Sequence, residues 1–314
     1  MPTTELIAVV GPTGTGKSDL AISLAQYLDE NGRRAAIVNA DSMQFYRGMD
    51  IGTAKLPQSE RGGVTHHLLD WLEVKDESTA AEYQTRARAL ILQLQKDKVT
   101  PILVGGSMLY VAAVLNTFEF PARDAALRQS LEEELIQHGS LALHQRLESL
   151  DPIAASRIIP QNGRRVVRAL EIVLLTGQPF AAALPDEPQD WQPVLEIGLN
   201  SDRENLKIRL ANRVSKMWNS GLLGEVEGLI PLGIREGKTA SQAIGYAQAL
   251  AQLDGRKSEQ EAIAETIQLT NRYARRQMSW FKRDGRIQWL DYQDPLFVER
   301  AKNLVQEQIL ADAI

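Results

Sequence analysis

Short apolar segments alternate with amphipathic ones over the first third of the chain. Leu6–Val10, Ala35–Ala40 and Pro101–Val104 are strand-sized apolar runs, and each is followed by a glycine or an aspartate. Between them, Ser18–Asp29 and Ala80–Gln95 carry apolar residues mostly at helical spacing. This alternation of strand and helix predicts an α/β fold built on a parallel sheet.

The pattern changes near Pro121, from where helical periodicity dominates to about Pro193. Helices are expected over Arg123–His138, Leu141–Leu150, Gly163–Thr176, Arg203–Leu229, Ser241–Leu253 and Ser258–Lys282, and further strands over Val194–Leu199 and Ile287–Leu290. We therefore predict a core formed by residues 1–120 and 194–314, interrupted by a helical insertion domain over 121–193.

Composition excludes several classes of protein. The 314 residues are 44% hydrophobic and 24% charged, as in an ordinary globular protein, and the net charge of −5 argues against coating nucleic acid by bulk charge. With no cysteine, disulfides, thiolate metal sites and a cysteine nucleophile are excluded. The N-terminus does not read as a signal peptide, and no apolar run approaches 18 residues, so we expect a cytoplasmic protein with no membrane span.

The first strand runs into a phosphate-binding motif. Its residues are Gly11-Pro12-Thr13-Gly14-Thr15-Gly16-Lys17-Ser18, which fit G-x-x-x-x-G-K-[ST] between a strand and a helix. Such a loop points backbone N–H groups at an anion, with Lys17 adding charge and Ser18 placed to ligate Mg²⁺. The motif predicts a core like that of the P-loop NTPases, but it does not distinguish a nucleotide from another diphosphate.

Two further strand ends are expected beside this loop, because ligands of open α/β sheets sit beyond the carboxyl ends of the strands. Asp41 follows the second strand. Its carboxylate has three alternative roles there: metal ligand, general base, or merely a cap of the next turn. Ser107 follows the third strand and two glycines. A P-loop hydrolase usually has an acidic residue at the end of such a strand. That missing acid weakens the ATPase interpretation. The adjacent His66 and His67 do not suit a metal pair and favour a structural role.

Local basic clusters interrupt this acidic chain. Arg157, Arg164, Arg165 and Arg168 form one cluster, and residues 272–286 hold six basic residues against Asp284 alone, with aromatic residues between them. Basic and aromatic groups together suit contact with RNA, although a solvated helix with its aromatic side chains in the core has the same pattern.

Seven segments together resemble the bacterial tRNA dimethylallyltransferases (tRNA isopentenyltransferases). They are Gly11–Ser18, Asn39–Lys55, His66–Asp70, Gly105–Tyr110, Arg164–Glu171, Ala243–Tyr246 and Arg275–Phe281. The resemblance covers roughly residues 6 to 290, and Asn39–Lys55 is its most specific part. Ser107 stands where the family commonly has Thr, and Arg164 where Gln is usual.

The resemblance implies transfer of a dimethylallyl group from dimethylallyl diphosphate to N6 of the adenosine 3′ of the anticodon in tRNA. The P-loop would hold the donor's diphosphate with Mg²⁺, Asp41 would act as general base, and Ser107 would help orient the base. Arg213, four residues after Arg209 on one helix face, is a further candidate for diphosphate binding.

The implied RNA contacts lie in three segments, and the insertion would grip the anticodon stem-loop. They are Asp41, Ser42, Met43 and Gln44; Arg164, Arg165, Val166, Val167 and Arg168; and Arg275 and Arg276. We expect a monomer. The alternatives are a small-molecule P-loop kinase, an isopentenyltransferase acting on free adenine nucleotides, and a non-catalytic RNA-binding module with a nucleotide-sensing P-loop.

Overall fold

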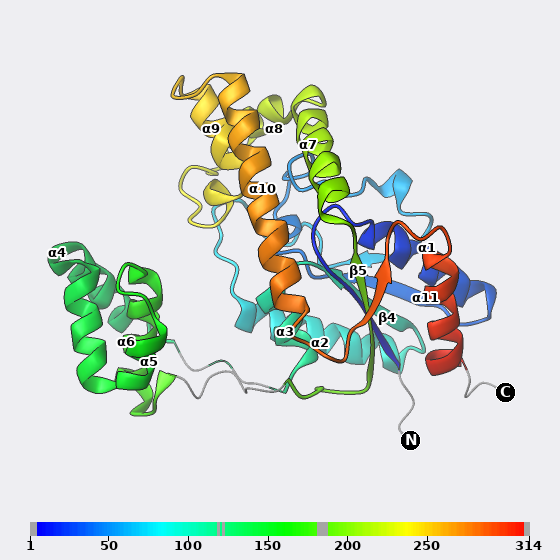
Figure 1. The fold of residues 1–314 in the computed structure, drawn as a ribbon, viewed down its shortest axis with the longest axis horizontal. Coiled ribbons are helices and arrows are strands. Elements are labelled where there is room, and N and C mark those ends of the chain that lie inside the picture. The colour runs from blue at the N-terminus through cyan, green and yellow to red at the C-terminus, as the bar shows by residue number, and fades with distance from the viewer. Residues whose placement is uncertain (1–4, 118–119, 121–122, 181–187, 311–314) are drawn as a thin grey trace. The chain divides into compact units, whose positions relative to one another are not determined.

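The computed structural model describes residues 5–117, 120, 123–180 and 188–310 (Figure 1). The chain divides into two compact units. The core unit combines Met1–Asn116 with Asp190–Ile314, and the helical unit is Thr117–Gln189. The helical unit begins and ends slightly earlier in the chain than the insertion predicted over 121–193.

Six parallel strands form the sheet of the core unit. They are β1 (Leu6–Val10), β2 (Ala35–Asn39), β3 (His66–His67), β4 (Thr100–Gly105), β5 (Val194–Asn200) and β6 (Gln288–Asp291), in the spatial order β3-β2-β4-β1-β5-β6. Every residue of β1 is 0% exposed, which accounts for its unbroken apolar sequence. In register, Val10 at the end of β1 lies between Gly105 of β4 and Gly198 of β5. The predicted α/β fold with a parallel sheet is confirmed.

Helices cover both faces of this sheet. They are α1 (Lys17–Glu30), α2 (Ala80–Lys96), α3 (Met108–Leu115), α7 (Arg203–Asn219), α8 (Leu222–Leu229), α9 (Tyr246–Leu253), α10 (Glu259–Phe281) and α11 (Phe297–Val305), with short turns η1 (Ser42–Phe45), η2 (Gln58–Glu60) and η4 (Ala240–Gln242) and a π-helical turn η5 (Gln306–Leu310). One apolar core packs α1 and α11, which lie side by side in Figure 1, against one face. A larger core packs α2, α3 and α7–α10 against the other.

Glycine accounts for two differences from the expected helices. The helix expected over 203–229 is divided into α7 and α8, because Gly221 adopts φ 94°. The helix expected over 241–253 begins only at Tyr246, because Gly245 also adopts φ 94°. Left-handed backbone is cheap for glycine and interrupts an α-helix. The short α3 and α11 were not expected from the hydrophobic pattern.

The helical unit has its own apolar core. Its helices are α4 (Ala125–Leu150), α5 (Pro152–Arg157) and α6 (Gly163–Thr176), and α4 is kinked at Gly139 (φ 78°, ψ 165°). At the centre, the fully buried Glu171 forms ion pairs with Arg128 at 3.2 Å and with Arg168 at 2.8 Å. A buried carboxylate needs such partners, since an unpaired charge is costly there.

Two features are absent from the described residues. None of their helices is both long and apolar enough to cross a membrane. Within the same residues, no group of three or more acidic, histidine or cysteine side chains could hold a metal ion.

Candidate functional site

The loop between β1 and α1 has the backbone expected of a phosphate cradle. Gly11, Gly14 and Gly16 adopt φ values of 132°, 85° and 79°. A side chain at Gly11 would also place its Cβ 2.4 Å from the carbonyl oxygen of Leu199 on β5. The motif therefore requires glycine here both for backbone conformation and for close packing against the sheet.

Lys17 is a half-buried cation with few partners inside this loop. Its Nζ donates to the carbonyl oxygen of Pro12 at 2.7 Å, and the Thr15 hydroxyl donates to the same oxygen at 2.9 Å. Burial lowers the pKa of Lys17 to about 8; the Asp41 charge opposes that shift and the Arg213 charge adds to it. An anion bound beside Lys17 would supply the missing counter-charge.

A cavity of about 260 Å³ opens from the cradle at the carboxyl ends of β1, β2 and β4. The predicted site residues that line it are Thr13, Gly14, Gly16, Lys17, Ser18, Asp41, Gln44 and Arg213. Others are Asn39, Thr53, His66, Leu69 and Arg209. Burial lowers the pKa of His66, and its Nδ1 lies 2.9 Å from the carbonyl oxygen of Val64. His66 thus has the structural contact expected of it, but it also faces the cavity.

Asp41 both caps a turn and faces the cavity. Its Oδ1 accepts from the backbone N–H of Met43 at 3.0 Å, at the start of η1. Its own N–H donates to Asn39 Oδ1 at 3.1 Å, which fixes the residue at the end of β2. The two roles weighed from the sequence are therefore compatible, because capping engages one carboxylate oxygen while the side chain still lines the cavity.

Ser107 contacts the segment that follows Asp41. It is 6% exposed, and its Oγ accepts from the Ser42 N–H at 3.0 Å and lies 3.1 Å from the Ser42 hydroxyl. Burial raises the pKa of Tyr273 of α10 to about 12, and its interaction with Ser107 opposes that rise. Ser107 does not line the cavity. Its contacts therefore fit a positioning role.

Gln277 of α10 ties the phosphate cradle to the loop after β4. It is 2% exposed; its Oε1 accepts from the Thr13 N–H at 2.9 Å, and its Nε2 donates to the Gly106 carbonyl oxygen at 2.8 Å. Sequence reasoning missed this role. The available signal was a glutamine at an otherwise apolar, core-facing position of the helix.

Arg213 joins the cradle to the chain after η1. Its Nη1 donates to the Thr13 hydroxyl at 3.1 Å, and its Nη2 donates to the Thr53 carbonyl oxygen at 3.2 Å. The Gln44 side chain donates to the same carbonyl oxygen at 3.2 Å. Arg213, predicted from its helix position alone, thus lies against the cradle.

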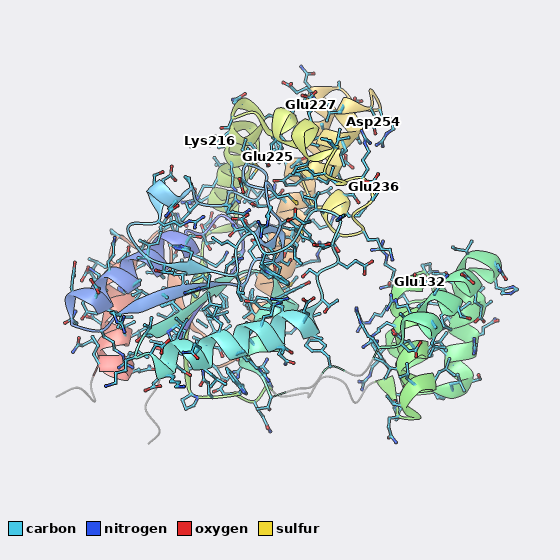
Figure 2. All side chains as sticks on the ribbon, turned by 180° about the vertical axis from the view of Figure 1, so that it is seen from behind. Glu132, Lys216, Glu225, Glu227, Glu236 and Asp254 are labelled. Carbon is cyan, nitrogen blue, oxygen red and sulfur yellow. The ribbon has the colours of Figure 1, made fainter. Side chains whose placement is uncertain are left out.

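A carboxylate of α8 fixes the loop that carries Thr53. Glu225, labelled in Figure 2, accepts from the backbone N–H groups of Asp50, Ile51 and Gly52 at 3.1, 2.7 and 3.4 Å. It also accepts from the Tyr246 hydroxyl at 2.6 Å. Four donors on one carboxylate hold this loop firmly, and the sequence pattern gave no sign of it.

The predicted RNA contacts of the helical unit are placed unequally. Arg164 and Arg165 are exposed on α6, whereas Arg168 is half-buried in its ion pair with Glu171. Val166 and Val167 are 0% exposed and belong to the apolar core of the unit. Their side chains therefore cannot reach an RNA in this arrangement, since helical periodicity turns them inward.

On the core unit, α10 presents its basic residues to solvent. Arg275 and Arg276 are exposed, whereas the next residue, Gln277, is buried. Arg286 does not belong to this surface, because it pairs with Asp284 at 2.5 Å and with Glu196 at 3.3 Å. The predicted cluster over 272–286 is thus smaller than its sequence suggests.

Comparisons with known proteins agree on one family. Residues 44–284 match the model of the family described as IPP transferase. The chain is 54% identical over 302 residues to a tRNA dimethylallyltransferase of Thermobifida fusca, covering 96% of this chain and 94% of the relative. It is 53% identical to a tRNA dimethylallyltransferase of Clavibacter sepedonicus, covering 95% and 97% of the two chains.

Solved structures resemble the whole chain. The crystal structure of a tRNA isopentenylpyrophosphate transferase from Bacillus halodurans has a TM-score of 0.70 at 35% identity, covering 99% of this chain and 98% of that one. A eukaryotic dimethylallyltransferase acting on tRNA has a TM-score of 0.79 at 26% identity, covering 99% and 80%.

Proposed function

The chain belongs to the IPP transferase family, and from that premise we propose that it is a tRNA dimethylallyltransferase. The reaction transfers a dimethylallyl group from dimethylallyl diphosphate to N6 of the adenosine 3′ of the anticodon and releases diphosphate. The observation that carries the proposal is one cavity lined by the phosphate cradle, Arg213 and Asp41. The leaving diphosphate needs the cations of the cradle and Arg213, and the acceptor, which must lose a proton, needs the Asp41 carboxylate beside them.

The cradle stabilises the diphosphate as negative charge develops on it. Lys17 is half-buried and has no carboxylate partner within the loop, and Arg213 is held at the cradle through Thr13. Both cations are therefore in place before the reaction, which is the condition under which electrostatic stabilisation of a leaving group is most effective.

The residues present also fit a magnesium ion. Mg²⁺ prefers oxygen ligands and commonly binds through one or two protein oxygens plus substrate phosphates. Ser18 supplies a hydroxyl on the cavity wall, and Asp41 supplies a strand-terminal carboxylate on the same wall. Bound there, the ion would neutralise charge on the diphosphate. We propose Ser18 as its protein ligand.

Asp41 acts as the general base in this proposal. The new bond forms between adenine N6 and the allylic carbon, the bond from that carbon to the diphosphate oxygen breaks, and the N6 proton passes to the carboxylate. Asp41 is held for this step by Asn39 and by its cap on η1. Ser107 keeps the adjoining Ser42 in position.

Exposed arginines on both units would contact the RNA. Arg164 and Arg165 on α6, and Arg275 and Arg276 on α10, have exposed side chains that can pair with phosphates. The target adenosine must leave the anticodon-loop stack to bring N6 to Asp41. The basic surfaces hold the loop while the base is extruded.

A transfer assay tests the proposal. The purified protein is incubated with Mg²⁺, labelled dimethylallyl diphosphate and unmodified tRNA bearing adenosine 3′ of the anticodon, without ATP. The label enters the tRNA and is lost when that adenosine is replaced by guanosine. Label in AMP or ATP instead would identify an enzyme of free nucleotides. No transfer to tRNA or to a free nucleotide would contradict the proposal and favour the alternative of a small-molecule P-loop kinase.

A further inference from the structure

The Thr53 carbonyl oxygen connects the donor side of the cavity with the acceptor side. It accepts from Arg213 Nη2 at 3.2 Å and from the Gln44 side chain at 3.2 Å, and all three residues line the cavity. Arg213 also donates to Thr13 of the phosphate cradle. Gln44 belongs to η1, the turn that Asp41 caps. The position of this one oxygen therefore affects groups on both sides.

The backbone around Thr53 needs support from other parts of the core unit. Ala54, the next residue, adopts φ 49°, in the left-handed region that residues with a side chain rarely adopt. Such a conformation persists only where surrounding contacts impose it. The Thr53 hydroxyl donates to the Met49 carbonyl oxygen at 2.6 Å, but this bond lies within the loop. A contact within the loop cannot fix where the loop lies beside the cavity.

Helix α8 supplies a contact from outside the loop. The Glu225 carboxylate accepts from three consecutive backbone N–H groups, those of residues 50–52, the last of which directly precedes Thr53. Each of these hydrogen bonds is charge-assisted and therefore stronger than one between neutral groups. Three neighbouring donors that converge on one carboxylate fix both the position and the direction of the backbone that leads to Thr53.

Tyr246 of α9 holds the carboxylate in turn. Its hydroxyl donates to Glu225 Oε1 at 2.6 Å. Burial raises the pKa of Tyr246 well above its usual value, and the Glu225 charge adds to that rise, so the hydroxyl keeps its proton and remains a donor. A Cβ on Gly52 would lie 2.4 Å from the Tyr246 ring. The loop therefore lies directly against Tyr246, with no room for a side chain at residue 52.

We propose that Glu225 is a positioning residue for the transfer reaction, because it fixes the carbonyl oxygen that holds Arg213 and Gln44. The inference rests on the proposed function, in which Arg213 stabilises the diphosphate. Glu225 does not line the cavity, so it acts only through the loop. A shift of the loop away from the cavity takes one hydrogen-bond partner from Arg213 and one from Gln44 at the same time.

Calorimetric titration with inorganic diphosphate in Mg²⁺ tests this inference on wild type, Glu225→Gln, Arg213→Ala and the double variant. Glutamine has no charge and only one acceptor oxygen, so the loop loses most of its anchor. Glu225→Gln should bind diphosphate about tenfold more weakly than wild type, as expected when a charged group loses a hydrogen-bond partner. In the Arg213→Ala background the same substitution should weaken binding less than about threefold, because the residue through which Glu225 acts is absent.

Glu227→Gln is the matched control, because Glu227 is exposed on the same helix and the substitution removes the same charge (Figure 2). It should bind diphosphate like wild type. Hydrogen exchange of the N–H groups of residues 50–52 should become faster in Glu225→Gln and stay unchanged in the control. In the transfer assay, kcat of Glu225→Gln should fall by up to about 10²-fold, which a misplacement of about 1 Å can cause.

Two results would overturn the inference. One is a Glu225→Gln variant whose diphosphate Kd and kcat both lie within about threefold of wild type. The other is an equal weakening of diphosphate binding with and without Arg213. Glu225→Asp keeps the charge but withdraws it by one methylene group, and it replaces Glu225→Gln in the same cycle if that variant does not fold. Failure of wild type to transfer the label would contradict the proposed function, whereas the diphosphate cycle would still decide whether Glu225 positions Arg213.

Discussion

Replacing Asp41 by asparagine separates the two roles of this side chain. The Asp41 carboxylate caps η1 through Oδ1 and lines the cavity as the proposed base. An asparagine keeps an oxygen that can accept from the Met43 N–H, but it cannot take a proton from N6. Asp41→Ala removes both functions, so comparing the two variants assigns each effect to its cause.

The magnitudes of the two effects differ enough to tell them apart. General-base catalysis is typically worth about 10²–10⁴-fold in rate, or ~2.7–5.4 kcal/mol of activation free energy. Loss of a capping side chain costs about 0.5–2 kcal/mol of stability. Both variants should therefore lose about 10²–10⁴-fold in kcat, and only Asp41→Ala should lose stability.

The assay measures kcat at saturating donor and tRNA at pH 7. This pH matters because the Asp41 charge raises the pKa of Lys17, which is about 8 in the wild type. Without that charge the pKa falls, so donor saturation must be verified for each variant. Binding of tRNA should change little. A kcat for Asp41→Asn within about tenfold of wild type would refute the assignment of Asp41 as the base.

Four further perturbations probe other parts of the structure. Arg165→Ala should weaken tRNA binding and reduce its salt dependence by about one phosphate contact, measured by filter binding; loss of donor binding alone would contradict this placement. Because Lys17 is charged only below about pH 8, the diphosphate Kd should rise above that pH, and a flat calorimetric profile from pH 7 to 9.5 would disprove it. Gln277→Leu leaves the Thr13 N–H and the Gly106 carbonyl without their partner, so kcat/KM should fall and unfolding should become easier by about 1–3 kcal/mol; a fully active variant of wild-type stability would remove its positioning role. Burial raises the pKa of Glu196 to about 7, so wild type should lose up to ~3 kcal/mol of stability relative to Glu196→Gln as pH rises from about 5 to 8. Denaturant titrations measure this loss, and the same pH dependence of stability in both proteins would contradict it.

The features predicted well from the sequence are those encoded by neighbouring residues. The cradle consists of eight consecutive residues, and its backbone follows from glycines at fixed spacing. The strand ends were predictable because apolar runs stop at Gly11, Asp41 and Gly105, and parallel strands bring such ends to one edge of the sheet. Local pattern therefore locates the site.

Contacts between distant residues could not be predicted in the same way. Gln277 meets Thr13 across 264 positions of sequence, and Glu225 meets the chain at Asp50–Gly52 through tertiary packing alone. Helical periodicity did indicate that two residues of the Arg164–Glu171 motif, which the resemblance implied as RNA contacts, are buried. Val166, Val167 and Leu170 share the apolar side of α6, so burial of the two valines follows from their spacing.

The order of strands in the sheet has a consequence for how the chain folds. β1 pairs with β5, so Leu6 cannot pair until Val194 has been synthesised, and the whole helical unit is synthesised between them. Contacts at such separation are slow to form, whereas a bundle of local helices folds quickly. Asn116 and Asp190 are bridged in the core unit, and Thr117 and Gln189 hydrogen-bond at the base of the helical unit. Once the helical unit has folded, its two ends are already together, and the loop that must close to complete the sheet is effectively shortened by its length.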